Sequence, residues 1–213
     1  RKELKNLFSH GVTNPPTRQL YYDDLDLFAK VLKMRKEAGL KTSPVFLGKG
    51  SNLRFGAPSE SAKLEELKKK VKQIIAIVKE VYGDSEVYFY GIDEAKGEKL
   101  KSQRPAWKAI HEAGGKVRVS SYQKGDEIFK EMGDLLDMII WGGRKPSDPK
   151  QAKEWHSIGH RIIRYNLPQA GVENPEIYRR NYGLSLWKAN FDGAMTFSYH
   201  EPFGHPYSDI DEP

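Results

Sequence analysis

The sequence predicts an α/β protein, a (β/α)8 TIM-type barrel that lacks its first strand in this chain. The first observation is a recurrent junction, in which a helical pattern ends at a glycine and an apolar strand follows. The second is that these strands are continuous apolar runs, such as residues 87–90, as is typical of parallel strands buried on both faces. The junction glycines are Gly11, Gly39, Gly83, Gly114, Gly133, Gly159 and Gly193.

Seven strands preceded by one helix fit an eight-stranded barrel without its first strand, since a complete barrel has roughly 250 residues. A doubly wound open sheet is the alternative fold. It is less favoured because no glycine-rich phosphate loop of the dinucleotide or Walker type follows any strand. The segment at residues 48–51, Gly-Lys-Gly-Ser, is too short to be one.

The predicted helices have an apolar face and their own start signals. One face is formed by Leu25, Phe28, Ala29 and Leu32, and another by Leu64, Leu67, Val71, Ile74 and Ile75. A third helix begins at Asp148-Pro149-Lys150-Gln151, where Asp148 is the expected N-cap and Gln151 completes a capping-box pattern. Such helices cover the faces of a parallel sheet.

Composition limits the class of protein. The 213 residues are 38% hydrophobic, enough for one core, so we expect a single domain over residues 1–213. No stretch reaches the roughly 20 apolar residues of a membrane helix. The absence of cysteine excludes disulfides and thiolate-based metal sites. The net charge of +6 comes partly from Lys68–Lys70, which we interpret as a solvated helix face rather than a nucleic-acid site.

Polar and aromatic residues gather where the predicted strands end. In a parallel barrel these positions meet at one face, which is the active face. Aromatic rings stack on sugar rings, and amides and carboxylates bind sugar hydroxyls, so the pattern predicts a carbohydrate substrate. The candidate substrate-binding residues are Asn14, Tyr122, Trp141, Tyr165, Asn166, Tyr199, His200 and Glu201.

Two adjacent carboxylates, Asp93 and Glu94, follow the aromatic strand at residues 87–90 and are the predicted catalytic residues. Two neighbouring acids delivered into a pocket by an aromatic strand are expected to have the pKa of at least one raised by desolvation and mutual repulsion, and a carboxyl that stays protonated near neutral pH can act as a general acid. The alternative interpretation is a solvated acidic turn before a helix, where the helix dipole favours negative charge. His200, Glu201 and His205 are a less favoured metal site, because nothing in the sequence fixes their geometry, and the sequence predicts neither a metal nor a cofactor.

The sequence resembles glycoside hydrolase family 123 and its related glycoside-hydrolase-like domains. The likeness lies in Tyr90-Gly-Ile-Asp-Glu-Ala95, in Tyr182-Gly-Leu-Ser-Leu-Trp187 and in Asp192-Gly-Ala-Met-Thr-Phe-Ser-Tyr199. Members carry an Asp-Glu pair at the end of the fourth barrel strand, and usually an N-terminal β-sandwich that this chain does not contain. The resemblance implies a secreted or periplasmic protein.

The same resemblance implies removal of a terminal β-linked N-acetylhexosamine, with N-acetylgalactosamine favoured. The mechanism would be retaining and substrate-assisted, through an oxazolinium intermediate. Glu94 would be the general acid and base, and Asp93 would hold the acetamido group of the substrate.

The end of strand seven of the complete barrel, the sixth strand predicted in this chain, agrees with that mechanism, because residues 164–168, Arg-Tyr-Asn-Leu-Pro, contain no acid that could be a nucleophile. Two alternatives remain open. One is a two-carboxylate glycosidase that uses Glu94 and Glu201, and the carboxyl separation would then indicate a retaining or an inverting reaction. The other is a barrel that binds glycans without catalysis. The sequence predicts no oligomeric state.

Overall fold

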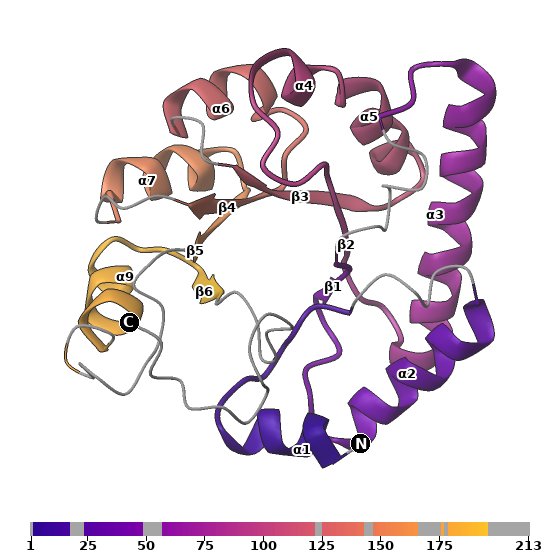
Figure 1. Ribbon diagram of the computed structural model, residues 1–213, viewed down its shortest axis with the longest axis horizontal. Coiled ribbons are helices and arrows are strands. Elements are labelled where there is room, and N and C mark those ends of the chain that lie inside the picture. The colour runs from indigo at the N-terminus through magenta and orange to yellow at the C-terminus, as the bar shows by residue number, and fades with distance from the viewer. Residues whose placement is uncertain are drawn as a thin grey trace, which may run out of the picture.

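The six described strands form one parallel sheet in chain order. The computed structural model describes residues 2–17, 24–48, 57–121, 125–142, 147–165, 176 and 179–195. The strands follow an arc with the helices outside it (Figure 1). A doubly wound sheet would reverse its strand order at a switch point, so this order identifies a partial (β/α)8 barrel. The strands are β1 (Val45–Phe46), β2 (Val87–Tyr90), β3 (Lys116–Ser121), β4 (Met138–Gly142), β5 (Arg161–Tyr165) and β6 (Gly193–Met195).

The helices bury the apolar faces that the sequence predicts. Phe28 and Leu32 of α2 are buried, and so are Leu67, Val71 and Ile74 of α3. In the described part of the chain, no helix is long and apolar enough to cross a membrane. The helices are α1 (Lys2–Ser9), α2 (Leu25–Glu37), α3 (Ser61–Tyr82), α4 (Gly97–Lys101), α5 (Arg104–Glu112), α6 (Gly125–Met132), α7 (Pro149–Ser157), the π-helix η2 (Arg180–Leu184) and α9 (Ser185–Lys188).

The predicted end signals of the helices are largely confirmed. Asp148 is the N-cap of α7, and its carboxylate accepts a hydrogen bond from the Lys150 amide at 2.9 Å. The reciprocal capping-box bond is missing, because the side-chain oxygen of Gln151 has no hydrogen-bond partner. Five junction glycines adopt the positive φ that helix C-caps require: Gly11, Gly39, Gly83, Gly114 and Gly159.

The first predicted strand, at residues 12–14, is not a strand in the structure. Within the described residues 2–17, pairing with the sheet is found at Thr17, through a parallel bridge to Leu47 beyond β1. Pro15 and Pro16 have no backbone N–H to donate to a ladder, so regular pairing cannot begin before Thr17. Pairing with the sheet is therefore found five residues after the predicted start of this strand at residue 12.

The sheet has two different faces. The outer face packs its apolar side chains, among them Phe89, Val119 and Ile162, against the helices in one large core. The inner face lies inside the arc and has a smaller apolar cluster of Tyr88, Tyr90, Met138, Ile140 and Ile163. Residues alternate between these faces along each strand, which decides whether a strand residue can reach the barrel interior.

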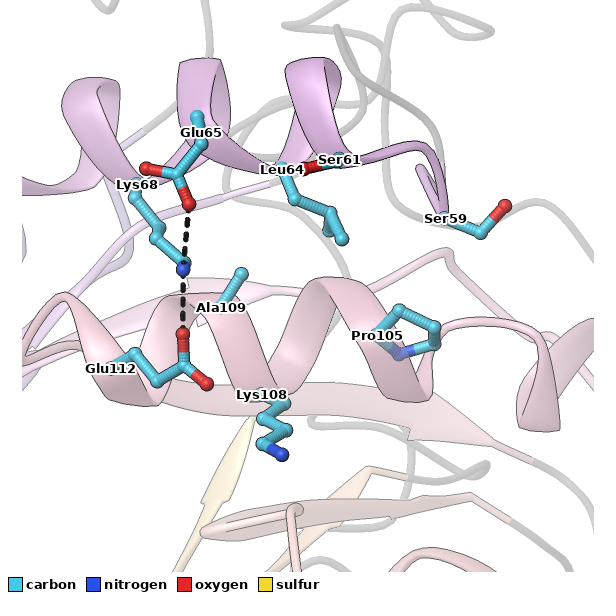
Figure 2. Close-up of a pocket in the computed structure, with 9 residues that line it drawn as sticks. All are labelled: Ser59, Ser61, Leu64, Glu65, Lys68, Pro105, Lys108, Ala109 and Glu112. Carbon is cyan, nitrogen blue, oxygen red and sulfur yellow. Dashed lines mark hydrogen bonds and ion pairs between the residues drawn. The ribbon is translucent and has the colours of Figure 1, made fainter.

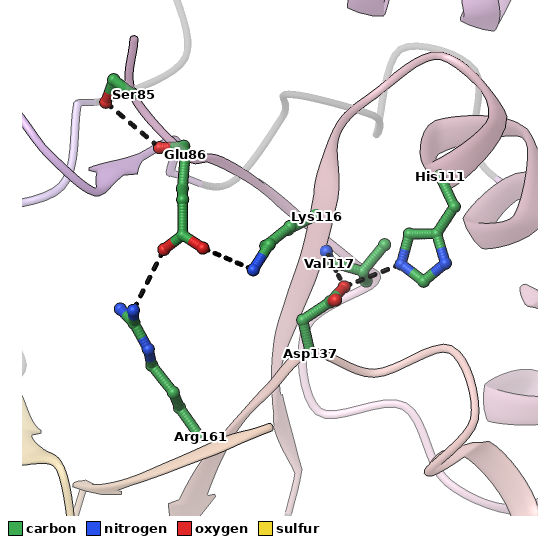
Figure 3. A network of polar contacts seen from close by, with 7 residues as sticks. All are labelled: Ser85, Glu86, His111, Lys116, Val117, Asp137 and Arg161. Carbon is green, nitrogen blue, oxygen red and sulfur yellow. Dashed lines mark hydrogen bonds and ion pairs between the residues drawn. The ribbon is translucent and has the colours of Figure 1, made fainter. Parts of the chain in front are cut away.

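At the amino ends of the strands, charged side chains tie neighbouring segments together (Figure 3). Glu86, just before β2, forms ion pairs with Lys116 of β3 and, at 3.0 Å, with Arg161 of β5. Both cations lie over the ring of Tyr88, 5.7 and 5.8 Å from its centre. The amino end of the described barrel interior therefore contains paired charges packed over an aromatic ring.

Two aspartates each accept hydrogen bonds both from a strand and from the helix that precedes that strand. Asp137, just before β4, accepts hydrogen bonds from the Val117 amide of β3 and from His111 of α5, both at 2.7 Å (Figure 3). Asp192, just before β6, accepts in the same way from the Ile162 amide at 2.8 Å and from His156 at 3.0 Å. In both cases the aspartate before one strand binds the preceding strand and a histidine of the helix that leads into that preceding strand. We call this arrangement an Asp–His clasp.

The first clasp should make the stability of the protein depend on acidity. Burial raises the pKa of Asp137, but hydrogen bonds from His111 and Val117 outweigh it and leave the pKa below the ordinary value of 3.8. A depressed carboxyl pKa stabilises the fold above the ordinary value, and this contribution is lost as the pH falls through the folded-state pKa.

We therefore expect Asp137→Asn to lower the free energy of unfolding by about 1–3 kcal/mol at pH 7. The difference from wild type should shrink as the pH falls below about 4, and urea unfolding between pH 2 and 7 measures it. Asp84→Asn is the control, because that carboxylate is 93% exposed. A deficit that stays constant down to pH 2 would contradict the prediction.

Candidate functional site

The Asp93–Glu94 turn lies at the carboxyl end of β2, where the sequence placed it. The hydroxyl of Tyr90 donates a hydrogen bond to the Asp93 carboxylate at 2.5 Å, and it accepts one from the Ser120 amide at 3.3 Å. Asp93 is partly buried and Glu94 is exposed. The turn thus joins a carboxylate and a phenol at the face where barrel enzymes carry their chemistry.

Backbone contacts with β3 hold this turn in an uncommon conformation. Glu94 has a φ of 55°, in the left-handed region that side-chain-bearing residues rarely adopt. Its amide donates to the carbonyl of Ser120 at 3.1 Å, and the Ser121 hydroxyl donates to the carbonyl of Ala95 at 3.2 Å. Such conformations cost free energy, persist when neighbours fix them and cluster at functional sites.

Tyr90 remains a hydrogen-bond donor over the whole physiological pH range. Burial and the hydrogen bond to Asp93 both raise the pKa of the Tyr90 hydroxyl above its ordinary value of 10.0. A protonated phenol that donates to Asp93 leaves that carboxylate oxygen as the acceptor. The pair therefore has a defined polarity, with the Tyr90 hydroxyl as the donor and the Asp93 carboxylate as the acceptor.

Arg118 crosses the barrel interior below this turn. Its side chain is buried, and its guanidinium donates two hydrogen bonds to the carbonyl of Leu47, at 2.8 and 3.3 Å. It also contacts the sulfur of Met195 in β6, at 3.6 Å. The guanidinium lies 5.2 Å from the centre of the Tyr90 ring, within cation–π distance. Arg118 thus links β3 to both ends of the sheet and brings a positive charge close to Tyr90.

Two of the other predicted site residues lie elsewhere. The side chain of Asn14 donates to the carbonyl of Pro44 at 2.7 Å, which places Asn14 at the amino end of β1. Trp141 belongs to the outer core, where the guanidinium of Arg164 lies 4.5 Å from its ring. Asn14 lies there because the chain pairs with the sheet at Thr17, beyond the two prolines. Trp141 faces the outer core because side chains alternate between the two faces along β4.

Tyr165 is at the last position of β5 and packs against the inner cluster, at the carboxyl end like Asp93. The remaining predicted residues lie outside the described part of the chain. They are Tyr122, Asn166, Tyr199, His200 and Glu201. Of the predicted set, the described structure thus places Asp93, Glu94 and Tyr165 at the carboxyl ends of strands.

Among the described residues, no three His, Asp or Glu side chains form a cluster that could hold a metal ion. Two surface hollows are described, and both lie outside the barrel. One, of about 300 Å³, lies between α3 and α5, where Lys68 bridges Glu65 and Glu112 at 2.9 and 2.7 Å (Figure 2). The other is lined by residues of α5 and α6 and by His160. Neither includes a residue of the Asp93 turn.

The sequence interpretation missed two buried polar residues beside the turn, Arg118 and Gln103. A signal for Arg118 was available, because Lys116, Arg118 and Ser120 alternate with valines along β3. Period-two polarity in a buried strand indicates that its other face lines a polar interior. Gln103 has no such periodic signal, since it lies in the short connection between α4 and α5.

Comparison with known proteins identifies the fold. No protein-family model matches the chain. A search of curated proteins finds no relative. D-psicose 3-epimerase from Clostridium cellulolyticum H10 is structurally similar, with a TM-score of 0.54 at 11% identity, over 92% of this chain and 77% of that one. A sugar phosphate isomerase/epimerase from Parabacteroides distasonis ATCC 8503 has a TM-score of 0.53 at 12% identity, over 96% of this chain and 82% of that one.

These neighbours contradict the predicted membership in glycoside hydrolase family 123. With it fall the predicted N-acetylhexosaminidase activity and the classification of the protein as a glycosidase with a substrate-assisted mechanism. The physical reason is that the resemblance depended on short motifs around an acidic turn. Barrels of many chemistries place carboxylates at strand ends, so such a turn does not specify hydrolysis.

The prediction of a TIM-type barrel is confirmed by the same comparison. Identities of 11% and 12% establish the shared fold and no more, because one fold serves many reactions. The chain is therefore a partial (β/α)8 barrel whose solved structural neighbours include a sugar epimerase and a sugar phosphate isomerase/epimerase.

Proposed function

We propose that this barrel is an isomerase or epimerase of a small sugar, acting at a carbon beside the carbonyl group. The observation that carries the proposal is the 2.5 Å hydrogen bond between the Tyr90 hydroxyl and the Asp93 carboxylate at the carboxyl end of β2. Supporting it, the structurally similar proteins are a sugar epimerase and a sugar phosphate isomerase/epimerase that share this barrel.

In the proposed reaction Asp93 is the base that removes the proton from the carbon next to the carbonyl. The electron pair of that C–H bond forms a carbon–carbon double bond, and negative charge moves onto the carbonyl oxygen. For isomerisation, the proton held by Asp93 is delivered to the former carbonyl carbon. The hydroxyl on the deprotonated carbon gives its proton to the former carbonyl oxygen and becomes the new carbonyl group. For epimerisation, the carbon takes a proton from solvent water on its opposite face, and Asp93 releases its own proton to the hydroxide that remains, so that no net proton is gained or lost.

The neighbouring side chains have defined parts in this proposal. Tyr90 fixes the orientation of the carboxylate, because its hydroxyl remains protonated. The positive charge of Arg118, 5.2 Å from the Tyr90 ring centre, favours the negative charge that develops on the substrate. Glu94, exposed beside Asp93, is the candidate for binding a sugar hydroxyl. Carbohydrate is thus the proposed substrate class.

The test is solvent isotope exchange. The protein is incubated in D2O with D-psicose, D-tagatose, D-fructose and their phosphates, with and without added divalent cations, and proton NMR follows the C–H signals beside the carbonyl. We expect deuterium to enter one of these sugars, and Asp93→Asn to slow its entry by about 10²-fold or more, the usual effect of a lost general base.

Asp84→Asn is the matched control, since it makes the same change at an exposed carboxylate. It should exchange deuterium at the wild-type rate. Absence of exchange by the wild-type protein with every sugar in the panel would contradict the proposed function. Exchange that survives Asp93→Asn unchanged would remove Asp93 from the reaction.

A further inference from the structure

The Asp93 turn is held from the helical side by one buried amide, that of Gln103. The side-chain oxygen of Gln103 accepts a hydrogen bond from the Ile92 amide at 2.7 Å. Gln103 is 1% exposed, so this bond is shielded from competing water. Ile92 directly precedes Asp93, and the hydrogen bond therefore acts one residue from the proposed base.

Gln103 is itself rigidly placed. It is the N-cap residue of α5, and its carbonyl accepts from the Trp107 amide at 3.0 Å while its own amide donates to the carbonyl of Leu100 at 3.2 Å. Its side-chain nitrogen donates to the carbonyl of Lys99 at 3.5 Å. A side chain fixed at a helix end transmits the position of that helix to whatever it binds.

Close packing at Gly91 strengthens the same connection. A Cβ atom at this position would lie 3.1 Å from the side-chain oxygen of Gln103, and also 3.1 Å from atoms of Trp107 and Val119. Glycine therefore allows the chain leaving β2 to pass directly against Gln103. The turn is thus fixed from two sides, by β3 through the Glu94 amide and by α5 through the Ile92 amide.

We propose that Gln103 is a positioning residue that orients the Asp93 carboxylate by fixing the backbone of the turn. The role in turnover rests on the proposed function, whereas the fixing of the turn does not. Gln103 reaches Asp93 only through the backbone at Ile92, so its loss should displace the carboxylate without removing a substrate contact.

The test replaces the amide by a thioether of similar size, in Gln103→Met. Amide hydrogen exchange at residues 92–94 should rise about fivefold or more, because the Ile92 amide loses its acceptor. Exchange in the middle of β3 and β4 should stay at the wild-type level. In the isotope-exchange assay, kcat should fall about tenfold or more while KM stays within about twofold, since displacements of about 1 Å cost up to about 10²-fold in rate.

Two further variants complete the experiment. Gln151→Met removes another glutamine amide, on α7, whose side-chain oxygen has no hydrogen-bond partner, and it should leave both readouts unchanged. The added methyl group in Gly91→Ala crowds the side-chain oxygen of Gln103. This variant should therefore change amide exchange and kcat in the same direction as Gln103→Met does. It provides the answer if Gln103→Met does not fold.

The results distinguish this proposal from the proposed function. Wild-type exchange at residues 92–94 in both Gln103→Met and Gly91→Ala would overturn the fixing of the turn. Faster amide exchange with unchanged kcat in an active enzyme would overturn the positioning of Asp93. If the wild-type protein turns over none of the sugars, the proposed function fails, and raised amide exchange in the variants would still establish that Gln103 fixes the turn.

Discussion

Replacing Trp107 by alanine should destabilise the protein more than any other substitution considered for this chain. Trp107 of α5 is 0% exposed and is among the largest fully buried side chains, packed in the core between the helices and the sheet. Removal of a buried tryptophan costs about 3–5 kcal/mol, through lost burial and the cavity left behind. Its indole N–H has no hydrogen-bond partner in the described part of the chain, so the loss is one of packing.

Urea unfolding followed by far-UV circular dichroism measures the loss in the free energy of unfolding. In a thermal melt we expect the midpoint to fall by about 10 °C or more. Trp187→Ala is the matched control. Trp187 is 83% exposed on α9, so its removal should change the free energy of unfolding by no more than about 0.5 kcal/mol. Equal effects of the two substitutions would show that the core described for α5 is wrong.

Gly133→Ala should also be strongly destabilising, although it adds only one methyl group. A Cβ atom at Gly133 would overlap the backbone carbonyl oxygen of Phe129, and that carbonyl accepts the hydrogen bond from the Gly133 amide at 2.9 Å. Backbone cannot move aside as a flexible side chain can, so the end of α6 must distort. We expect a loss of about 1–3 kcal/mol, the usual cost of overpacking.

The control for this substitution is Gly183→Ala in the π-helix η2. A Cβ atom at Gly183 would have no neighbour within 4 Å among the residues that the structure describes. Replacement there should be neutral or slightly stabilising, because alanine restricts the unfolded chain more than glycine does. Denaturant unfolding measures the free energy of unfolding of both variants. A neutral Gly133→Ala would mean that α6 ends differently from the structure described.

The fold could be predicted because its signals are local. Helix faces such as Phe28 with Leu32, the N-cap at Asp148 and the glycine junctions each need only a few neighbouring residues to be recognised. Continuous apolar strands then indicate a parallel sheet. The glycine junction at Gly11 predicts a strand at residues 12–14, but pairing is found at Thr17, because Pro15 and Pro16 have no N–H to donate to a neighbouring strand.

The candidate site was only partly predictable, because its contacts join residues far apart in the chain. Asp93 was found from its place after a strand, but its link to Gln103 through Ile92 has no sequence signature. The sequence does not show which face of the sheet Trp141 lies on, because all five residues of β4 are buried and the strand has no polar alternation. The reaction was wrong because a short acidic motif is common to many barrel chemistries.

The paired Asp–His clasps have an evolutionary consequence. Each joins a strand to its neighbour at the amino end, through Asp137 and Asp192, and neither involves the loops that follow the strands. Mutations in those loops can therefore alter which molecule is recognised without loosening the clasped end. A barrel whose Asp–His contacts lie at the amino end can therefore change residues in the loops at the carboxyl end and acquire new specificities while these contacts still hold its strands together.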